Sequence, residues 1–236
     1  MNKTMNKVIF SSHQKELLTN VRRFVTDYFS KAEGKGIFKG GHGFDHTQRV
    51  TGMAVLLAGM EGYDPFLCAL AALLHDLGRA SLRPAASNWR HGQLSKEISE
   101  EIINSLNLSS DDTTLIKNAI EDHPKLNKDV RESILVKILM DSDRLDVIGA
   151  IGPVRSAAHR WKLPLYSSNI KSGTDETQIK TIYQDFAVRG LATYQFLWTK
   201  SARKLAEPKI KFQKKFIEEY RRELSFAHQS FDNLDI

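Results

Sequence analysis

The sequence predicts an all-α fold. Apolar residues recur at i, i+3, i+4 and i+7 spacing along most of the 236 residues, which is the pattern of helices that bury one face. No segment shows the sustained period-two alternation of half-buried strands, so we expect almost no sheet. The length predicts one large domain or one domain with an extension. We expect a helical core at residues 12–162 and, packed on it, an extension at residues 163–236 that adds a C-terminal helical pair.

The first expected helix begins near Ser12, after a loose leader, and ends at the glycines of residues 34–36. Its apolar positions have helical spacing: Leu17, Val21, Phe24 and Tyr28. A glycine-rich loop follows at residues 40–43, where the backbone has few steric limits. His42 lies in this loop and is interpreted as a loop histidine rather than a metal ligand.

A second helix is expected over residues 44–62. His46 and Arg49 share its inward face and lie about one turn apart. Arg49 has two interpretations. Its planar guanidinium is suited to bidentate hydrogen bonds with a phosphate. It is equally suited to a structural ion pair with Asp45 or Asp146.

The third helix is expected to start at Asp64 and Pro65, as N-cap and first helical residue. It runs through small and apolar residues to Leu77, and Gly78 fits its C-cap. The adjacent pair His75–Asp76 therefore falls in the last turn of a buried helix. Such a pair is either a hydrogen-bonded couple in the core or part of a metal site, because buried charges are tolerated when they coordinate a metal.

Three more helices follow. One comes after a loop rich in turn residues at 80–92 and contains Leu94, Ile98 and Ile102. The next begins at Ser110 and ends before Pro124. The third covers residues 130–148, which are nearly all apolar and are interrupted by Asp143, so it is expected to be central and buried.

The C-terminal part is expected to form two long helices, after a short helical stretch to Trp161 and a polar loop at residues 164–176. The first runs from Ile179 to about Ala206, and Pro208 begins the second. Both carry many lysines and arginines but no motif that we assign. Their aromatic spacing is more typical of packing than of a base-stacking surface.

The composition is that of an ordinary globular chain, with 41% hydrophobic and 26% charged residues. A net charge of +6 gives mild support for an anionic ligand such as a nucleotide, or for loose contact with nucleic acid. The single cysteine, Cys68, excludes an internal disulfide and is expected to be a small buried thiol. The sequence contains neither an apolar run of about 18 residues nor a signal-peptide stretch, so we expect no membrane span and a cytoplasmic location.

Three segments around the polar side chains resemble one family. They are residues 43–50 (GFDHTQRV), 72–80 (ALLHDLGRA) and 143–152 (DRLDVIGAIG). A histidine, a His-Asp pair and a distant aspartate on an apolar helix resemble the ligand set of the HD-domain superfamily of metal-dependent phosphohydrolases. The resemblance covers roughly residues 15 to 160. Within the superfamily, the chain is similar to the small stand-alone bacterial HD hydrolases. One activity described in that subgroup is nucleotide pyrophosphohydrolysis.

The resemblance implies an HD-domain helical bundle with four metal ligands: His46, His75, Asp76 and Asp143. Nitrogen and oxygen ligands without thiolate favour manganese, with iron, cobalt, nickel or magnesium as alternatives, over structural zinc. Such a metal lowers the pKa of bound water and polarises a phosphoryl oxygen. The expected reaction is hydrolysis of a phosphate ester or anhydride in a nucleotide.

His91 and His123 are expected to act with Asp76 as catalytic groups. In the superfamily, extra histidines at comparable points in the chain either bind a second metal or face the site to bind phosphate or transfer protons, and a structural role stays open too. Arg79 and Arg49 are expected to contact substrate. Some members of the superfamily carry an acidic catalytic residue at the position of Arg79, so the arginine argues against that nucleoside-monophosphatase branch.

Three classes of function remain open. A hydrolase of nucleotides or other small phosphorylated metabolites is preferred. A phosphodiesterase acting on a cyclic or dinucleotide signal, or on an oligonucleotide end, is the alternative, and a two-metal site would favour it. A non-catalytic binding module that uses the positive surface is the least expected, since it would leave four metal ligands without use. The sequence indicates neither the base or sugar that the enzyme prefers in a nucleotide nor its oligomeric state.

Overall fold

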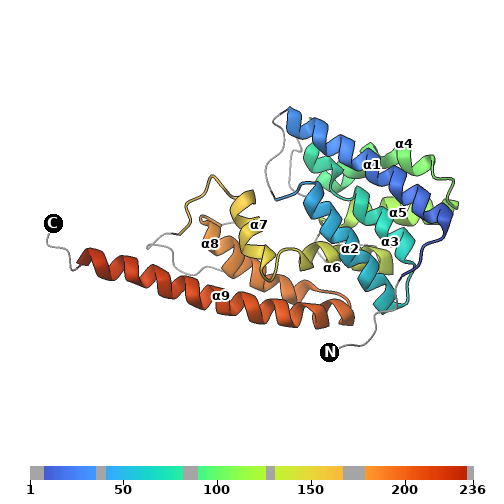
Figure 1. Ribbon diagram of the computed structural model, residues 1–236. Coiled ribbons are helices and arrows are strands. Elements are labelled where there is room, and N and C mark those ends of the chain that lie inside the picture. The colour runs from blue at the N-terminus through green and yellow to red at the C-terminus, as the bar shows by residue number, and fades with distance from the viewer. Residues whose placement is uncertain (1–7, 36–40, 82–89, 126–130, 167–178, 233–236) are drawn as a thin grey trace.

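The computed structural model describes residues 8–35, 41–81, 90–125, 131–166 and 179–232. Within these ranges the chain forms helices and turns and no strand, which confirms the all-α prediction (Figure 1). The first helices pack around a common core: α1 (Ser12–Gly34), α2 (Phe44–Glu61), α3 (Pro65–Leu74), α4 (Arg90–Asn104), α5 (Ser110–Asp122) and α6 (Ile134–Leu145). None of the described helices combines the length and the apolar character that crossing a membrane requires.

Helix α3 is the centre of this bundle. All of its residues from Phe66 to Leu74 are buried, because it is apolar on every side and is in contact with α1, α2, α4, α5 and α6. Asp64 accepts a hydrogen bond from the Phe66 backbone N–H at 2.7 Å, and Pro65 is the first helical residue, as predicted. Cys68 is a buried free thiol, also as predicted.

The predicted end of α3 is wrong by about one turn. The helix ends at Leu74, and a 3-10 turn, η1 (Leu77–Ala80), follows. Gly78 is therefore not a C-cap. A Cβ at this position would lie 2.3 Å from the His91 carbonyl oxygen, so the glycine is needed for the close approach of α4. Its N–H donates to Ser95 Oγ at 2.8 Å, which ties α4 to the residues that follow α3.

The C-terminal part of the chain continues through several short helical pieces and then one long helix, α9. They are α7 (Ile151–His159), α8 (Ile182–Gln184), the π-helix η4 (Asp185–Gly190), the 3-10 turn η5 (Thr193–Phe196) and α9 (Lys200–Asp232). The break between the two predicted C-terminal helices was expected before Pro208, but Pro208 lies inside α9. It is exposed there, and its missing N–H removes one hydrogen bond without ending the helix.

A buried carboxylate on α6 sets the true start of α9. Asp141 accepts hydrogen bonds at 2.8 Å from the Trp198 N–H, the Thr199 N–H and the Thr199 hydroxyl. The Thr199 hydroxyl in turn accepts from the Ala202 N–H at 3.1 Å, as an N-cap does. The helix therefore begins directly after Thr199, where the fold supplies the cap.

Replacing Asp141 with alanine is expected to lower the free energy of unfolding by roughly 3 kcal/mol, because three donors, two of them backbone N–H groups, lose a charged acceptor in the core. Urea denaturation followed by circular dichroism measures this change. Glu207→Ala, at an exposed position of α9, is the control and should leave the midpoint unchanged. Equal midpoints for Asp141→Ala and the wild type would show that the cap does not hold α9.

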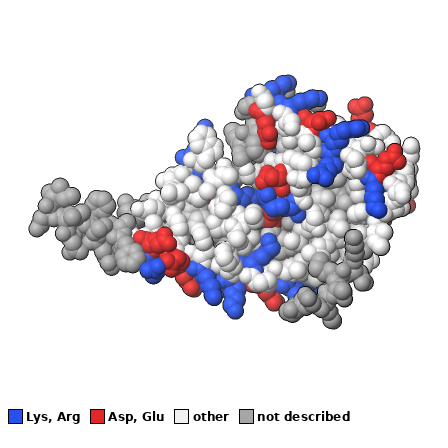
Figure 2. All heavy atoms as spheres, in the orientation of Figure 1, with Lys and Arg blue, Asp and Glu red and all other residues white. Residues whose placement is uncertain are grey.

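The C-terminal part shares the main core. Leu197, Ala202 and Ala206 are buried with the residues of α1 to α6, whereas Ile182, Phe186, Ala187 and Ile217 form a second, small apolar cluster. The division into residues 12–162 and 163–236 stays a prediction. Beyond the body, α9 extends away from the other helices (Figure 1). Lysines and arginines follow the same edge of the molecule (Figure 2), and α9 carries exposed lysines there: Lys204, Lys211, Lys214 and Lys215.

Candidate metal centre

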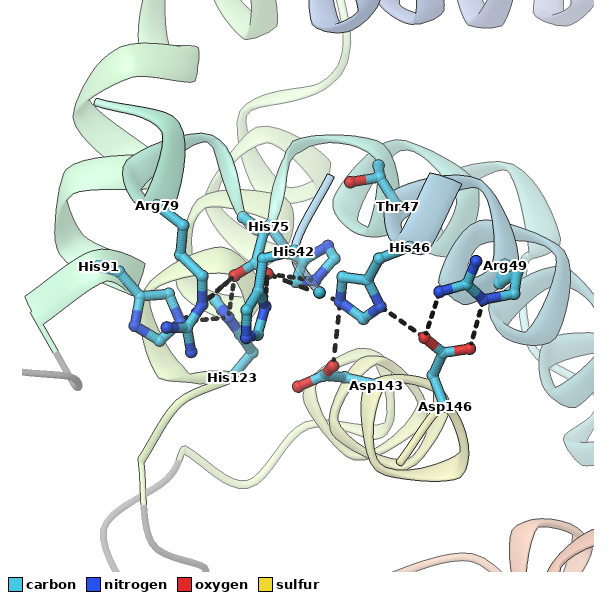
Figure 3. Close-up of polar contacts among 12 residues, drawn as sticks. His42, His46, Thr47, Arg49, His75, Arg79, His91, His123, Asp143 and Asp146 are labelled. Atoms are coloured by element: carbon cyan, nitrogen blue, oxygen red, sulfur yellow. Dashed lines mark hydrogen bonds and ion pairs between the residues drawn. The ribbon is translucent and has the colours of Figure 1, made fainter. Parts of the chain in front are cut away.

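Side chains from five elements meet at one end of α3 (Figure 3). His46 lies in the first turn of α2, and the pair His75–Asp76 directly follows α3. His91 is the second residue of α4, His123 directly follows α5, and Asp143 lies in the last turn of α6. The structure therefore brings together all the residues predicted as metal ligands and both predicted catalytic histidines.

His75 has the environment of a metal ligand. The ring is fully buried, and its Nδ1 donates to the Ala72 carbonyl oxygen at 2.7 Å. Burial lowers the pKa of His75 to about 4, so the ring is neutral at physiological pH. Its Nε2 is buried and has no hydrogen-bond partner among the described residues. Metal-binding histidines are neutral, with one ring nitrogen hydrogen-bonded to an acceptor and the other left to coordinate the metal. His75 has this arrangement, with Nε2 as the nitrogen left for the metal.

His46 is held in the same way by a carboxylate. Its Nδ1 lies 2.7 Å from Asp146 Oδ2, while Nε2 lies 3.3 Å from Asp143 Oδ1 and 3.6 Å from Asp76 Oδ2. Burial and the charge of Arg155 lower the pKa of His46, but hydrogen bonds to the three carboxylates outweigh them and raise it to about 9. A metal ion would replace the proton on Nε2, because a coordinating imidazole nitrogen must be neutral.

Asp76 lies between the histidines. Its Oδ2 is 2.9 Å from His42 Nδ1 and 3.6 Å from His75 Nε2, and its Oδ1 accepts from Arg79 Nε at 3.1 Å. Burial alone would raise the pKa of Asp76, but the charges of His75 and Arg79 and hydrogen bonds from His123 and His42 hold it well below its usual range. Asp76 is therefore an ionised carboxylate whose two oxygens face different groups of side chains.

His91 and His123 face the other oxygen of Asp76. Their Nε2 atoms lie 3.0 Å apart, and each is 3.4 to 3.5 Å from Asp76 Oδ1. The Nδ1 of His123 lies 2.7 Å from the Ile120 carbonyl oxygen, so its Nε2 is the nitrogen that faces His91 and Asp76. The two rings are therefore close enough to each other and to Asp76 to exchange a proton.

The donor atoms of His46, His75 and Asp143 all lie within 4.8 Å of one another, and so do those of His75, Asp76 and His123. Burial would raise the pKa of Asp143, but hydrogen bonding and charge from His46, with Arg155 and His75, hold it well below its usual range. Neutral imidazoles and ionised carboxylates without thiolate fit a divalent transition metal.

The comparison with known proteins agrees with this donor set. Residues 43–148 match the family model of the HD domain. Residues 43–148 therefore form an HD domain. This domain marks the chain as a metal-dependent hydrolase, and the matched segment begins just before His46 and ends just after Asp146.

Several bacterial proteins are similar to this chain. The chain is 26% identical over 192 residues to the uncharacterized protein YpgQ of Bacillus subtilis, which covers 78% of this chain and 85% of YpgQ. The crystal structure of YpgQ in complex with ADP superposes with a TM-score of 0.67 at 24% identity, covering 89% of this chain and 96% of that one. An HD-superfamily hydrolase from Bacillus thuringiensis gives a TM-score of 0.66 at 24% identity, covering 90% and 98%. These structures share the fold.

In the HD domain, Arg49 positions His46 indirectly, through Asp146. The guanidinium donates to Asp146 through Nε at 2.8 Å and Nη2 at 3.1 Å, and to Asp45 through Nη1 at 2.8 Å. Of the two interpretations of Arg49, the structure therefore shows the ion pair. A contact with substrate stays a prediction for which this geometry offers no support. Arg49 instead holds Asp146, which holds His46 (Figure 3).

Replacing Asp146 with alanine is expected to weaken metal binding about tenfold to a hundredfold, because His46 loses the acceptor that orients its ring. Titration of the metal-free protein with Mn²⁺ in a calorimeter measures the change. Asp45→Ala is the matched control, since Asp45 pairs with the same arginine but is exposed, and the carboxylate that contacts His46 Nδ1 is that of Asp146. An Asp146→Ala protein that binds Mn²⁺ as tightly as the wild type would show that Asp146 does not position His46.

Two neighbours of the HD-domain site were not anticipated. His42 does precede α2, as the loop interpretation says, but it also contacts Asp76 and belongs with His46 and Asp76 to a third group of closely spaced donor atoms. Arg155, on α7, was not singled out at all. Its Nη2 lies 3.1 Å from both His42 Nδ1 and His46 Nε2, and its Nε donates to the Gly41 carbonyl oxygen at 2.7 Å.

Proposed function

We propose that this HD-domain protein hydrolyses nucleotides, as a nucleoside triphosphate pyrophosphohydrolase or in a related cleavage of a phosphate anhydride or ester, with manganese as its metal. One observation carries the proposal. Donor atoms of His46, His75 and Asp143 lie within 4.8 Å of one another, Asp76 Oδ2 lies 3.6 Å from the Nε2 atoms of both histidines, and each ring is fixed through Nδ1. The complex of the relative YpgQ with ADP supports a nucleotide as the ligand.

The chain supplies the groups that this reaction needs. The four residues His46, His75, Asp76 and Asp143 would hold the metal, which supplies a water of lowered pKa and polarises a phosphoryl oxygen. Asp76 accepts hydrogen bonds at both oxygens, so it can orient that water as well as bind the metal. His91 and His123 offer two imidazoles, with their Nε2 atoms 3.0 Å apart, beside Asp76. Arg79 is partly exposed next to Asp76 and is placed to meet a phosphate oxygen while it stabilises the carboxylate.

A phosphodiesterase of a cyclic or dinucleotide signal, or of an oligonucleotide end, is the second candidate. The observation that favours it is the convergence of His91 Nε2 and His123 Nε2 on Asp76 Oδ1, the oxygen that does not face His46 and His75. Such a pair could hold a second cation, with Asp76 bridging the two. The number of metals in the purified protein separates the two candidates.

A screen of nucleoside mono-, di- and triphosphates with Mn²⁺ is expected to show hydrolysis of triphosphates with release of pyrophosphate. Product analysis that distinguishes pyrophosphate from phosphate identifies the bond that is cleaved, and a parallel reaction with a chelator shows the dependence on metal. Linear and cyclic dinucleotides test the second candidate in the same assay. Activity that persists in the presence of the chelator, or no turnover of any nucleotide, would contradict the proposal.

A further inference from the structure

The segment at residues 155–160 carries an unusual share of unsatisfied polar atoms. In the described part of the chain, six buried side-chain nitrogen or oxygen atoms have no hydrogen-bond partner, and three of them are Arg155 Nη1, His159 Nδ1 and Arg160 Nε. Buried polar atoms in native proteins nearly always have a partner in the protein, in water or in a ligand. Three within six residues point to a ligand with several acceptor oxygens.

The first two of these residues lie beside the metal centre. Arg155 is only 7% exposed, and its Nη1 lies 3.7 Å from Asp146 Oδ2 and 3.8 Å from Asp143 Oδ1, which are ion-pair distances but too long for hydrogen bonds. The ring of His159 packs edge-on against that of His42 with 4.9 Å between the centroids, and His42 contacts Asp76. The helix approaches so closely that a Cβ at Gly41 would lie 2.9 Å from the His159 Cβ. The face of α7 that holds Arg155 and His159 therefore adjoins the predicted ligands.

Around Arg160, two arginines approach a single carboxylate, that of Asp185. Asp185 is fully buried and accepts two hydrogen bonds from Arg189, at 2.7 and 3.1 Å, while Arg160 approaches it only to 3.5 Å. One carboxylate thus faces two guanidinium groups. Burial, together with the charges of Arg160, Arg79 and Arg189, lowers the pKa of His159 to about 4, so its ring is neutral at physiological pH.

We propose that Arg155, His159 and Arg160 form an anion subsite for the second phosphate group of a pyrophosphate-containing ligand whose first phosphate lies at the metal centre. The proposal rests on the proposed function, because the two share one site, and it narrows the substrate class to di- and triphosphates over monophosphates. Guanidinium N–H groups make short, strong bonds with phosphate oxygens, and a neutral imidazole adds one more donor. The subsite lies on α7 and on Arg160, which directly follows it, beyond the segment that matches the HD-domain model.

Calorimetric titration tests this directly. The probe is imidodiphosphate, whose P–N–P bridge resists hydrolysis, with inorganic phosphate as the single-phosphate comparison and Mn²⁺ in excess. The variants are Arg160→Gln and His159→Phe, which keep the size of the side chain while removing its donors. Arg155 is left intact because it also contacts His46. Lys204→Gln removes one positive charge from an exposed position of α9 and is the control.

The wild type is expected to bind imidodiphosphate more tightly than phosphate. Each variant should bind imidodiphosphate about tenfold to a hundredfold more weakly, as the loss of a hydrogen bond to a charged group predicts. Phosphate affinity, manganese content and the Lys204→Gln protein should be unchanged. Imidodiphosphate that binds both variants as it binds the wild type, or that binds the wild type no more tightly than phosphate, would overturn the subsite. Because binding is measured without turnover, a failure of the proposed nucleotide hydrolysis would be seen separately.

Discussion

Replacing Asp76 with alanine is expected to abolish hydrolysis and to remove the bound metal at the same time. Asp76 is buried, ionised and placed between His75 and His46 on one side and His91 and His123 on the other, so both functions depend on one carboxylate. The loss of turnover should be on the order of a thousandfold or more, as it is when one member of a catalytic unit is removed.

The measurement pairs the rate of nucleotide hydrolysis with elemental analysis of the same preparation. His75→Ala should behave in the same way, because it removes the bare Nε2 that faces the centre. Asp27→Ala, at an exposed position of α1, is the control for losing a carboxylate. If either variant keeps full turnover, the metal centre is misassigned. If metal is lost but turnover is kept, the metal has no part in the reaction.

The sequence was informative where chemistry and local periodicity determine the outcome. His46, His75, Asp76 and Asp143 were predicted as metal ligands because three segments resemble those of the HD-domain superfamily, and the structure brings the four side chains to one place. Helix α3 was predicted from its continuous apolar run, and its start from Asp64 and Pro65, because caps act through the next two or three residues. Such signals are local and need no knowledge of the neighbours.

Other features depend on contacts between distant segments, which no local pattern shows. Asp141 sets the start of α9 from 58 residues away, and it overrides the proline signal at Pro208. Gly78 resembled a helix cap but serves the approach of α4. Arg155 reaches His46 across 109 residues, only because α7 returns over the loop at Gly41. Asp146 was considered only as a partner of Arg49, although it also fixes the ring of His46.

His91 and His123 are expected to act on substrate or protons, with one cation bound per chain. Their Nε2 atoms lie 3.0 Å apart, and both lie within 3.5 Å of Asp76 Oδ1. A pair that exchanges a proton is suited to general acid–base catalysis, which contributes about a hundredfold to ten-thousandfold in rate. His91→Ala or His123→Ala should therefore lower turnover by this order and leave the metal content at one.

The alternative makes the opposite prediction for metal. If His91 and His123 are ligands of a second cation bridged by Asp76, the wild type should contain two metals per chain, and each alanine variant should contain one. Elemental analysis of the wild type and both variants, beside their rates, distinguishes the cases. His13→Ala, at an exposed position on α1, shows the effect of losing a histidine elsewhere. Two cations in the wild type that fall to one in either variant would replace the single-metal site with a two-metal site, and would favour the phosphodiesterase, since a second cation stabilises the leaving oxygen of a diester.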